Sequence, residues 1–188
     1  MDKRRFLVEY IKNFRQVGAV APSSRFLAQR MVDHPAFNTA KVIVEYGPGS
    51  GVFTDAILTV MRPDAKLVVI EQNPEFYSFL SAKYENNKSV VVLRDSAEHI
   101  REIARERGTK TVDIFVSGLP FAAMPKSVSH SILSESAKLL SGNGIFITFQ
   151  YSLLKKSLFE RYFMKLELKR EYKNLPPAYV VVCSEPKK

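Results

Sequence analysis

Cysteine, histidine and long apolar runs are scarce in this 188-residue sequence. A single cysteine, Cys183, excludes an internal disulfide, and three scattered histidines form no cluster of metal-ligand type. No stretch approaches the roughly 18 consecutive apolar residues of a membrane span. The basic first residues are not followed by the apolar core and cleavage site of a secretory signal. We therefore expect a cytoplasmic, monomeric protein without a metal ion.

The net charge of +9 is unevenly distributed along the chain. Residues 1–40 carry seven basic and three acidic side chains, residues 41–150 carry twelve of each, and residues 151–188 carry nine and four. The excess thus lies on the two flanks of a neutral centre. Such flanks are typical of contact with anionic lipid head groups or nucleic acid, although basic ends can also serve solubility alone.

Short runs rich in Val and Ile alternate with helical stretches through most of the chain. We predict strands at 42–46, 67–71, 90–93, 112–116 and 144–149. We predict helices at 52–61, 74–84, 97–107 and 127–140, the last stopped by Gly142 and Gly144. This alternation indicates an α/β fold with a parallel sheet covered by helices on both faces.

The pattern changes after the fifth strand. Met164, Leu166 and Leu168 alternate with charged residues, and residues 179–183 form another strand-like run after a break at Asn174 and two prolines. This predicts an antiparallel hairpin at the sheet edge. Five parallel strands followed by such a pair give the seven-stranded, Rossmann-like plan of class I methyltransferases, as distinct from dinucleotide dehydrogenases.

At this length we expect one domain over residues 1–188. Residues 1–35 form its N-terminal amphipathic helical segment, and residues 41–188 form its catalytic core.

The strongest local signal directly follows the first predicted strand and reads Glu45-Tyr46-Gly47-Pro48-Gly49-Ser50-Gly51. Gly47 and Gly49 allow a sharp turn and a close approach of the backbone to a ligand. The G-x-G-x-G spacing differs from the G-x-G-x-x-G that places a pyrophosphate on a helix N-terminus, which disfavours a dinucleotide. We expect S-adenosylmethionine here, with Glu45 facing its cationic methionine end, directly or through water. The alternative is a purely structural turn.

Acidic residues follow the next two strands at matching positions. Glu71 lies about twenty residues beyond the glycine loop, where a carboxylate accepts both ribose hydroxyls. Asp95 is expected to accept from the exocyclic amine of adenine, although Asp95 or Ser96 can instead cap the next helix.

With these residues placed, the sequence resembles bacterial phosphatidylethanolamine N-methyltransferases, a branch related to the rRNA adenine dimethylases. The resemblance covers nearly the whole chain and is carried by GAVAPSS at 18–24, EYGPGSGVFT at 45–54, EQNP at 71–74, SGLP at 117–120 and NLPPA at 174–178. It implies methyl transfer from S-adenosylmethionine, leaving S-adenosylhomocysteine, to the amino head group of phosphatidylethanolamine, once or repeatedly. The remaining cofactor contacts expected are Gln72, Ser96, Ala97, Ser117, Ser23 and Ser24.

The segment after the fourth strand separates the two related activities. Adenine N6-methyltransferases are similar in having Asn/Asp-x-Pro-Tyr there, which holds the target amine and stacks on the base. This sequence has Gly118, Leu119, Pro120 and Phe121. Gly118 supplies no side-chain acceptor, though Phe121 could still stack. Methylation of adenine in rRNA therefore remains the alternative, nucleic acid is the less expected partner, and a binding module without turnover is a third possibility.

Two groups of residues complete the expected site. Backbone oxygens at Gly118 and Leu119 are expected to orient the amine. The candidates for a general base, by residue type alone, are Tyr46, Ser117, Tyr151 and His130.

A basic amphipathic helix is predicted near the N-terminus. Its apolar side consists of Phe6, Leu7, Tyr10, Ile11, Phe14 and Val17, and Arg5, Lys12 and Arg15 lie opposite. Such a helix can lie in the interface of an anionic membrane or pack on the protein's own core. With the family resemblance we expect a peripheral location on the inner membrane face. The residues expected to meet substrate or membrane are Tyr10, Phe14, Arg15, Arg25, Tyr151 and Tyr179, with the phosphate partner among Arg15, Arg25 and Lys12.

Overall fold

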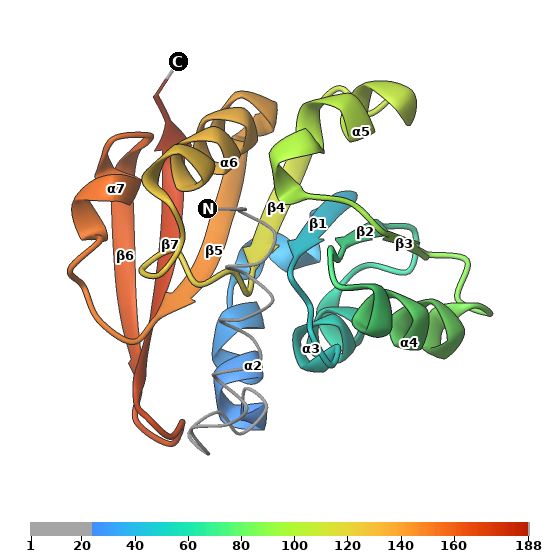
Figure 1. Cartoon of the computed structure of the whole chain (residues 1–188), viewed down its shortest axis with the longest axis horizontal. Coiled ribbons are helices and arrows are strands. Elements are labelled where there is room, and N and C mark those ends of the chain that lie inside the picture. Colours follow the sequence, from blue (N-terminus) through green and yellow to red (C-terminus); the bar gives the residue numbers. More distant parts are fainter. Residues whose placement is uncertain (1–23, 188) are drawn as a thin grey trace.

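The computed structural model describes residues 24–187, which form a sheet covered by helices (Figure 1). The strands are β1 (Val42–Tyr46), β2 (Lys66–Ile70), β3 (Val90–Leu93), β4 (Val112–Ser117), β5 (Leu140–Gln150), β6 (Phe163–Glu171) and β7 (Ala178–Pro186). The α-helices are α2 (Arg25–Val32), α3 (Val52–Val60), α4 (Pro74–Tyr84), α5 (Ile100–Glu106), α6 (Lys126–Leu139) and α7 (Lys156–Glu160). Two short 3-10 helices are η1 (Pro35–Asn38) and η2 (Ala97–His99).

The seven strands lie in the order β3-β2-β1-β4-β5-β7-β6. The first five are parallel, β7 is antiparallel to β5, and β6 is antiparallel to β7. The predicted α/β class and the terminal hairpin are therefore confirmed.

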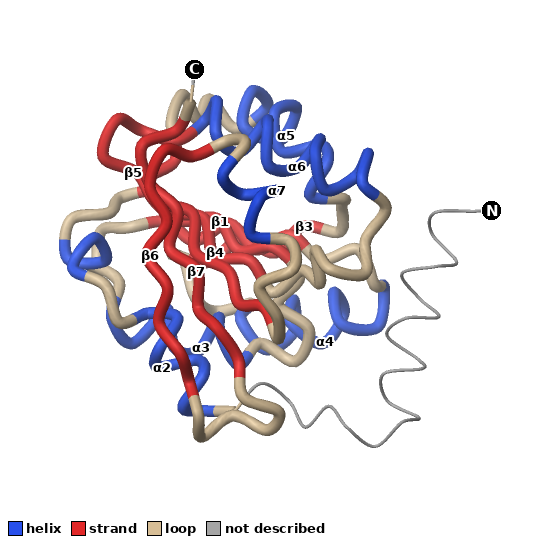
Figure 2. Tube along the Cα trace, turned by 90° about the vertical axis from the view of Figure 1, so that its left-hand side faces the viewer, coloured by secondary structure: helices blue, strands red, loops and turns tan. Residues whose placement is uncertain are grey.

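Helices cover both faces of the sheet, with α2, α3 and α4 on one face and α5, α6 and α7 on the other (Figures 1 and 2). Successive strand residues point to opposite faces, so each strand feeds two hydrophobic clusters. In β1, Ile43 packs with the α2 and α3 residues, whereas Val44 and Tyr46 pack with α5 and α6. Glu45 shares the face of Ile43 and so points toward α3.

The strand order reverses between β1 and β4, because the chain leaves β1 toward α3 on one face and leaves β4 toward α6 on the other. In open α/β sheets such a reversal opens a crevice at the carboxyl ends of the strands, where ligands bind. The predicted glycine loop and the residues after β4 both lie at this point.

Several element boundaries differ from the sequence expectation, and the helix predicted at 97–107 is divided into η2 and α5. Strand β5 begins at Leu140, before the two glycines expected to end the helix. At Gly144 an added Cβ would lie 2.7 Å from the Cδ2 of Leu140, so this glycine serves close packing inside the strand. Helix α7 has no counterpart in the prediction. Of the predicted helical segment 1–35, the structure describes residues 24–35, which contain α2, and η1 begins at the last of these residues.

Within residues 24–187, no helix is long and apolar enough to cross a membrane. The predicted amphipathic helix over residues 6–17 lies outside the described residues, as do Tyr10, Phe14, Arg15 and Ser23, and it stays a prediction.

Candidate active site

The loop after β1 turns through three glycines in the left-handed conformation, with φ of +59° at Gly47, +56° at Gly49 and +82° at Gly51. An added Cβ would lie 2.9 Å from the Cδ2 of Leu119 at Gly47 and 2.8 Å from the Cδ2 of Leu80 at Gly51. Around Gly49, by contrast, no heavy atom of the described residues lies within 4 Å of that position. The loop thus packs tightly at both ends and leaves an open face at Gly49, where a ligand can approach the backbone.

Glu45 lies beneath this loop and is fully buried, with 0% of its surface exposed. The Thr54 hydroxyl of α3 donates to its Oε2 at 2.7 Å, whereas its Oε1 has no hydrogen-bond partner among the described residues. Burial raises the pKa of Glu45 to about 8. A buried acceptor without a partner is costly unless a ligand or an ordered water supplies a donor, so the position suits the end of a cationic ligand.

Glu71 directly follows β2 and reaches across to the glycine loop. Its Oε2 accepts from the backbone N–H of Gly49 at 3.2 Å, and its Oε1 accepts from that of Asn73 at 2.8 Å. Burial raises its pKa, and these backbone hydrogen bonds oppose the rise. The structure therefore brings Glu71 next to the open face at Gly49, while neighbouring Gln72 is exposed.

Asp95 and Ser96, which follow β3, make different contacts. Ser96 is the N-cap of η2, because its hydroxyl accepts from the backbone N–H of Glu98 at 3.3 Å. The Oδ1 of Asp95 contacts the backbone N–H of Ser96 and the Nδ1 of His99, each at 2.7 Å. The capping interpretation is thus confirmed for Ser96, and Ala97 is buried.

The loop after β4 lies directly against the glycine loop. The backbone N–H of Gly118 donates to the carbonyl of Tyr46 at 2.8 Å. An added Cβ at Gly118 would lie only 2.5 Å from the carbonyl oxygen of Gly47. The hydroxyl of the buried Ser117 accepts from the backbone N–H of Leu119 at 3.3 Å. Contact between the two loops therefore excludes any side chain at position 118.

Tyr46 does not lie at this site. Its ring stacks on Phe115 at 5.3 Å in the core of the α6 face, and its hydroxyl is 3.0 Å from the Oγ of Ser136. Strand alternation turns Tyr46 away from the face that Glu45 occupies. The prediction that Tyr46 could act as the general base is therefore wrong.

Phe121, considered for stacking in the adenine alternative, and His130, a general-base candidate, also lie elsewhere. Phe121 is 1% exposed and packs edge-on against Phe159 at 5.4 Å, so it offers no free face to a base. The Nδ1 of His130 is 2.7 Å from the hydroxyl of Tyr162, beside α7. Neither side chain points into the crevice between β1 and β4.

A second group of aromatic residues gathers at the carboxyl end of β5. Tyr151 packs edge-on against Phe149 at 5.6 Å, and Phe149 packs against Phe53 of α3 at the same distance. Burial raises the pKa of Tyr151, and a hydrogen bond with the side chain of Asn174 opposes that rise.

Asn174 joins the loop between β6 and β7 to the start of α2. Its Oδ1 accepts from the backbone N–H of Ser24 at 3.1 Å, while the Ser24 hydroxyl caps α2 through the N–H of Leu27. The sequence predicted Asn174 only as part of a loop. The NLPP segment that contains it could have indicated that this loop has a structural role. Arg25 is exposed beside it, and Tyr179 lies under the guanidinium of Arg170 at 5.0 Å.

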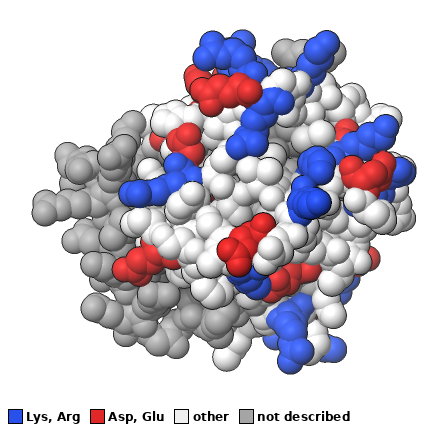
Figure 3. Space-filling model, turned by 90° about the vertical axis from the view of Figure 1, so that its right-hand side faces the viewer, with Lys and Arg blue, Asp and Glu red and all other residues white. Residues whose placement is uncertain are grey.

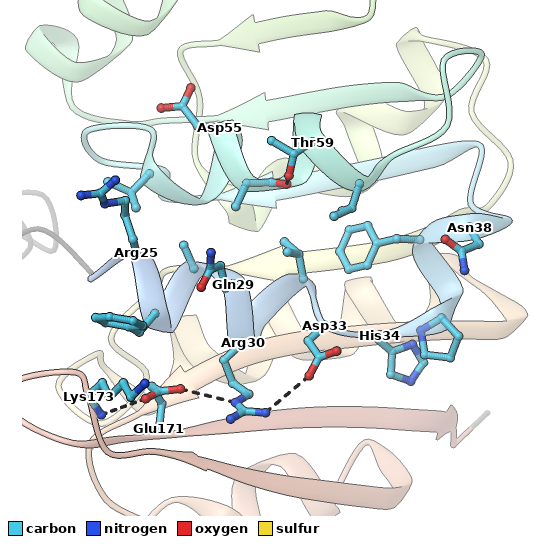
Figure 4. Close-up of a pocket in the computed structure, with 18 residues that line it drawn as sticks. Arg25, Gln29, Arg30, Asp33, His34, Asn38, Asp55, Thr59, Glu171 and Lys173 are labelled. Carbon is cyan, nitrogen blue, oxygen red and sulfur yellow. Dashed lines mark hydrogen bonds and ion pairs between the residues drawn. The ribbon is translucent and has the colours of Figure 1, made fainter.

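A groove of about 1130 Å³ runs between α2 and α3 (Figure 4). Arg25 and Lys173 lie at one end, and His34 and Asn38 at the other. Glu171 is held in it by Arg30, whose Nε lies 3.4 Å from the carboxylate. The groove reaches Val52, the first residue of α3 after the glycine loop, and so borders the site without containing it.

The strand order and the terminal hairpin together give the chain the Rossmann-like fold of class I methyltransferases. Residues 22–159 match the family described as Ribosomal RNA adenine dimethylase. The chain belongs to this family.

Individual relatives agree with this class. The chain is 29% identical over 180 residues to an Ornithine lipid N-methyltransferase from Singulisphaera acidiphila, covering 95% of this chain and 93% of that one. Its fold is similar to an O-methyltransferase from Bacillus cereus in complex with SAH, with a TM-score of 0.65, 13% identity and coverage of 96% and 91%. It is also similar to TrmN from Thermus thermophilus, with a TM-score of 0.61 and 14% identity over 84% of this chain and 48% of that chain.

Membership in this family makes the protein an S-adenosylmethionine-dependent methyltransferase. The open face at Gly49, the unpartnered Oε1 of Glu45 and the adjacent carboxylate of Glu71 fit such a cofactor. Among residues 24–187, no group of three His, Cys, Asp or Glu side chains could hold a metal ion.

Proposed function

We propose that this methyltransferase acts on the amino head group of phosphatidylethanolamine at the inner surface of a membrane. A relative of nearly equal length is named as a lipid N-methyltransferase, which supports an amine on a lipid as the acceptor. The basic flanks of the chain support contact with anionic head groups.

The observation that carries this proposal is the closed position at Gly118. Adenine recognition of the type described above needs a side-chain oxygen there and an aromatic face three residues later. An added Cβ at Gly118 would meet the carbonyl oxygen of Gly47 at 2.5 Å, and Phe121 is buried against Phe159. Both requirements for holding a flipped base are therefore missing, whereas a small primary amine needs neither.

The cofactor is assigned to the crevice beside the glycine loop. In this proposal Gly47 and Gly49 lie beneath the nucleoside, Glu71 binds the ribose hydroxyls and Asp95 the adenine amine. Glu45 faces the methionine end, and the remaining contacts come from Gln72, Ser96, Ala97, Ser117, Ser23 and Ser24. When bound, S-adenosylmethionine supplies an electrophilic methyl group on its sulfonium.

The acceptor must reach this methyl group as a neutral amine. An ethanolamine ammonium resembles that of lysine, with a pKa of about 10 in water. Burial raises the pKa of Tyr151, which makes its hydroxyl a hydrogen-bond partner rather than a base. We therefore assign deprotonation to desolvation: the amine releases its proton to water as it enters the site, because burial favours the neutral form. The backbone oxygens at Gly118 and Leu119, with Tyr151, Tyr179 and Arg25 around the head group, then orient it.

Product identification tests the proposal. The enzyme is incubated with methyl-labelled S-adenosylmethionine and either phosphatidylethanolamine vesicles or rRNA. Label is expected on the lipid amine, and label on RNA adenine, or on neither substrate, would overturn the proposal. A G49V variant serves as the inactive control, since its side chain would fill the open face and strain a left-handed residue.

Methylation of rRNA adenine is the second candidate, and the family match favours it. The same incubation decides between the two, whereas binding alone does not, because both lipid and RNA association weaken with salt.

A further inference from the structure

The loop between β6 and β7 holds apolar side chains in solvent. Tyr172 is 70% exposed and Leu175 is 82% exposed. Exposure of large apolar side chains to water is unfavourable, so such residues are usually more buried. Phe26, in the first turn of α2, is 47% exposed. A cluster of exposed large apolar side chains on a protein surface is typical of a contact site for another molecule.

Basic side chains accompany each of these aromatic rings. The guanidinium of Arg170 lies 4.8 Å from the ring centre of Tyr172, and the Nζ of Lys173 lies 5.0 Å from that of Phe26. The neighbouring acid, Glu171, is buried and paired with Arg30, so it does not cancel this charge at the surface. We call Phe26, Arg170, Tyr172, Lys173 and Leu175 the hairpin surface.

The hairpin surface lies on the same edge of the sheet as the cofactor crevice. Strand β7 is antiparallel to β5, with Tyr179 opposite Gln150, so the loop before β7 lies at the carboxyl edge of the parallel strands. The bond from Ser24 to Asn174 fixes the start of α2 against this loop, and both views show the two segments side by side (Figures 1 and 2).

Charges are arranged differently at the other end of the molecule. The face beyond β3 and α4 shows acidic and basic side chains interspersed among neutral ones (Figure 3). A surface with both charge signs interspersed is typical of a solvent-exposed face, and it attracts an anionic partner less than a purely basic surface does. Phe79 on α4 is also exposed, with the Nζ of Lys83 at 6.0 Å from its ring centre, but Lys83 is ion-paired with Asp55 at 2.6 Å, so an acid at the surface offsets its charge.

We infer that the hairpin surface docks on an anionic lipid bilayer, so that Tyr172, Leu175 and Phe26 enter the interface while Arg170 and Lys173 meet lipid phosphates. Each basic residue close to an anionic membrane adds a favourable electrostatic attraction to the lipid surface. Aromatic rings preferentially lie in the head-group region. This orientation turns the carboxyl edge toward the membrane, so a head group reaches the crevice without leaving the bilayer. The inference rests on the proposed function for its lipid partner. An aliphatic side chain as exposed as Leu175 favours lipid over RNA, which binds through stacking and phosphate contacts.

Vesicle binding of a Y172S/L175S variant tests the inference. The full-length protein is mixed with vesicles of equal parts phosphatidylglycerol and phosphatidylethanolamine, and the bound fraction is measured by flotation. The double variant should bind at least about tenfold more weakly, since two apolar side chains no longer enter the interface. A K173Q variant should weaken binding to these vesicles and leave binding to neutral phosphatidylcholine vesicles unchanged.

Met164 supplies the matched control, because it lies on the same hairpin at the opposite end and is 68% exposed. M164S should bind vesicles like the wild type, and all variants should keep their S-adenosylmethionine affinity, which shows that they fold. Equal vesicle binding by Y172S/L175S and wild type would overturn the inference. Loss of RNA binding instead, with vesicle binding unchanged, would overturn it in favour of RNA.

The two proposals can fail separately. If the double variant loses vesicle binding while the wild type places no label on lipid, the hairpin surface stands and the proposed substrate is wrong. If lipid is labelled and the double variant still binds vesicles normally, the substrate stands and the hairpin surface is wrong.

Discussion

Among the residues that the structure describes, Glu45 combines complete burial with a carboxylate oxygen that has no hydrogen-bond partner. It is fully buried next to the hydroxyl of Thr54, with Asp55, Glu71 and Lys83 as the charged groups around it. Burial raises its pKa from 4.5 to about 8, so in the folded protein without cofactor the carboxyl is protonated at neutral pH. A group with a raised acid pKa binds its proton more tightly in the folded state than in the unfolded state.

This environment predicts that stability falls as the pH rises from about 5 to 8. Between the unfolded and folded pKa values the folded protein holds one more proton, so the free energy of unfolding decreases by up to about 1.4 kcal/mol per pH unit. An E45Q variant, which resembles the protonated form and keeps an acceptor for Thr54, should lack this contribution. Urea unfolding of both proteins across this range measures the difference, and parallel pH dependences would contradict the prediction.

The sequence predicted which of several residues lie close together, and it misplaced others. The spacing of the glycines and the acids after β1 and β2 located Glu45, Gly49 and Glu71 at one crevice, because strand ends in a parallel sheet share an edge. Tyr46 was placed there by residue type, and Phe121 was considered only for stacking on adenine in the alternative; the structure buries both among aromatic rings. The direction of a side chain depends on strand phase and helix packing, which a list of candidate types does not contain.

At the scale of elements, the contact between the loops after β1 and β4 is the tightest feature of the site. In a G118A variant the added methyl group would meet the carbonyl oxygen of Gly47 at 2.5 Å, and backbone cannot move aside as a side chain does. We expect a loss of about 1–3 kcal/mol in the free energy of unfolding, together with weaker cofactor binding.

Gly142 provides the control for this substitution. It lies in β5, and no heavy atom of the described residues is within 4 Å of an added Cβ. G142A should therefore unfold at the same urea concentration as the wild type, and equal destabilisation of the two variants would argue against the loop contact.

The elements themselves were largely predictable. All five parallel strands and the hairpin appear where Val- and Ile-rich runs and turn residues indicate, because a doubly covered sheet needs continuous apolar strands. The start of β5 and the short α7 were missed. Gly144 reads as a helix stop in sequence, and only the approach of Leu140 shows that it lies within a strand.

For the molecule as a whole, charge distribution and apolar surface together support the proposed contact with a membrane. Residues 1–17 carry five basic and two acidic side chains, and the hairpin surface adds a second basic and apolar contact. Deleting residues 1–17 should reduce flotation with anionic vesicles to background, because one weak contact alone gives only marginal binding. S-adenosylmethionine binding, measured by calorimetry, should persist. Unchanged flotation of the truncated protein would contradict this prediction.

The hydrogen bond between Ser24 and Asn174 joins residues 150 positions apart in the chain. During synthesis, α2 therefore lacks this hydrogen bond until the loop between β6 and β7 has emerged from the ribosome. The nascent chain can form the cofactor crevice earlier, since β1, β2 and β4 precede the hairpin. The hairpin surface proposed for docking is therefore completed only when the last part of the chain has been synthesised.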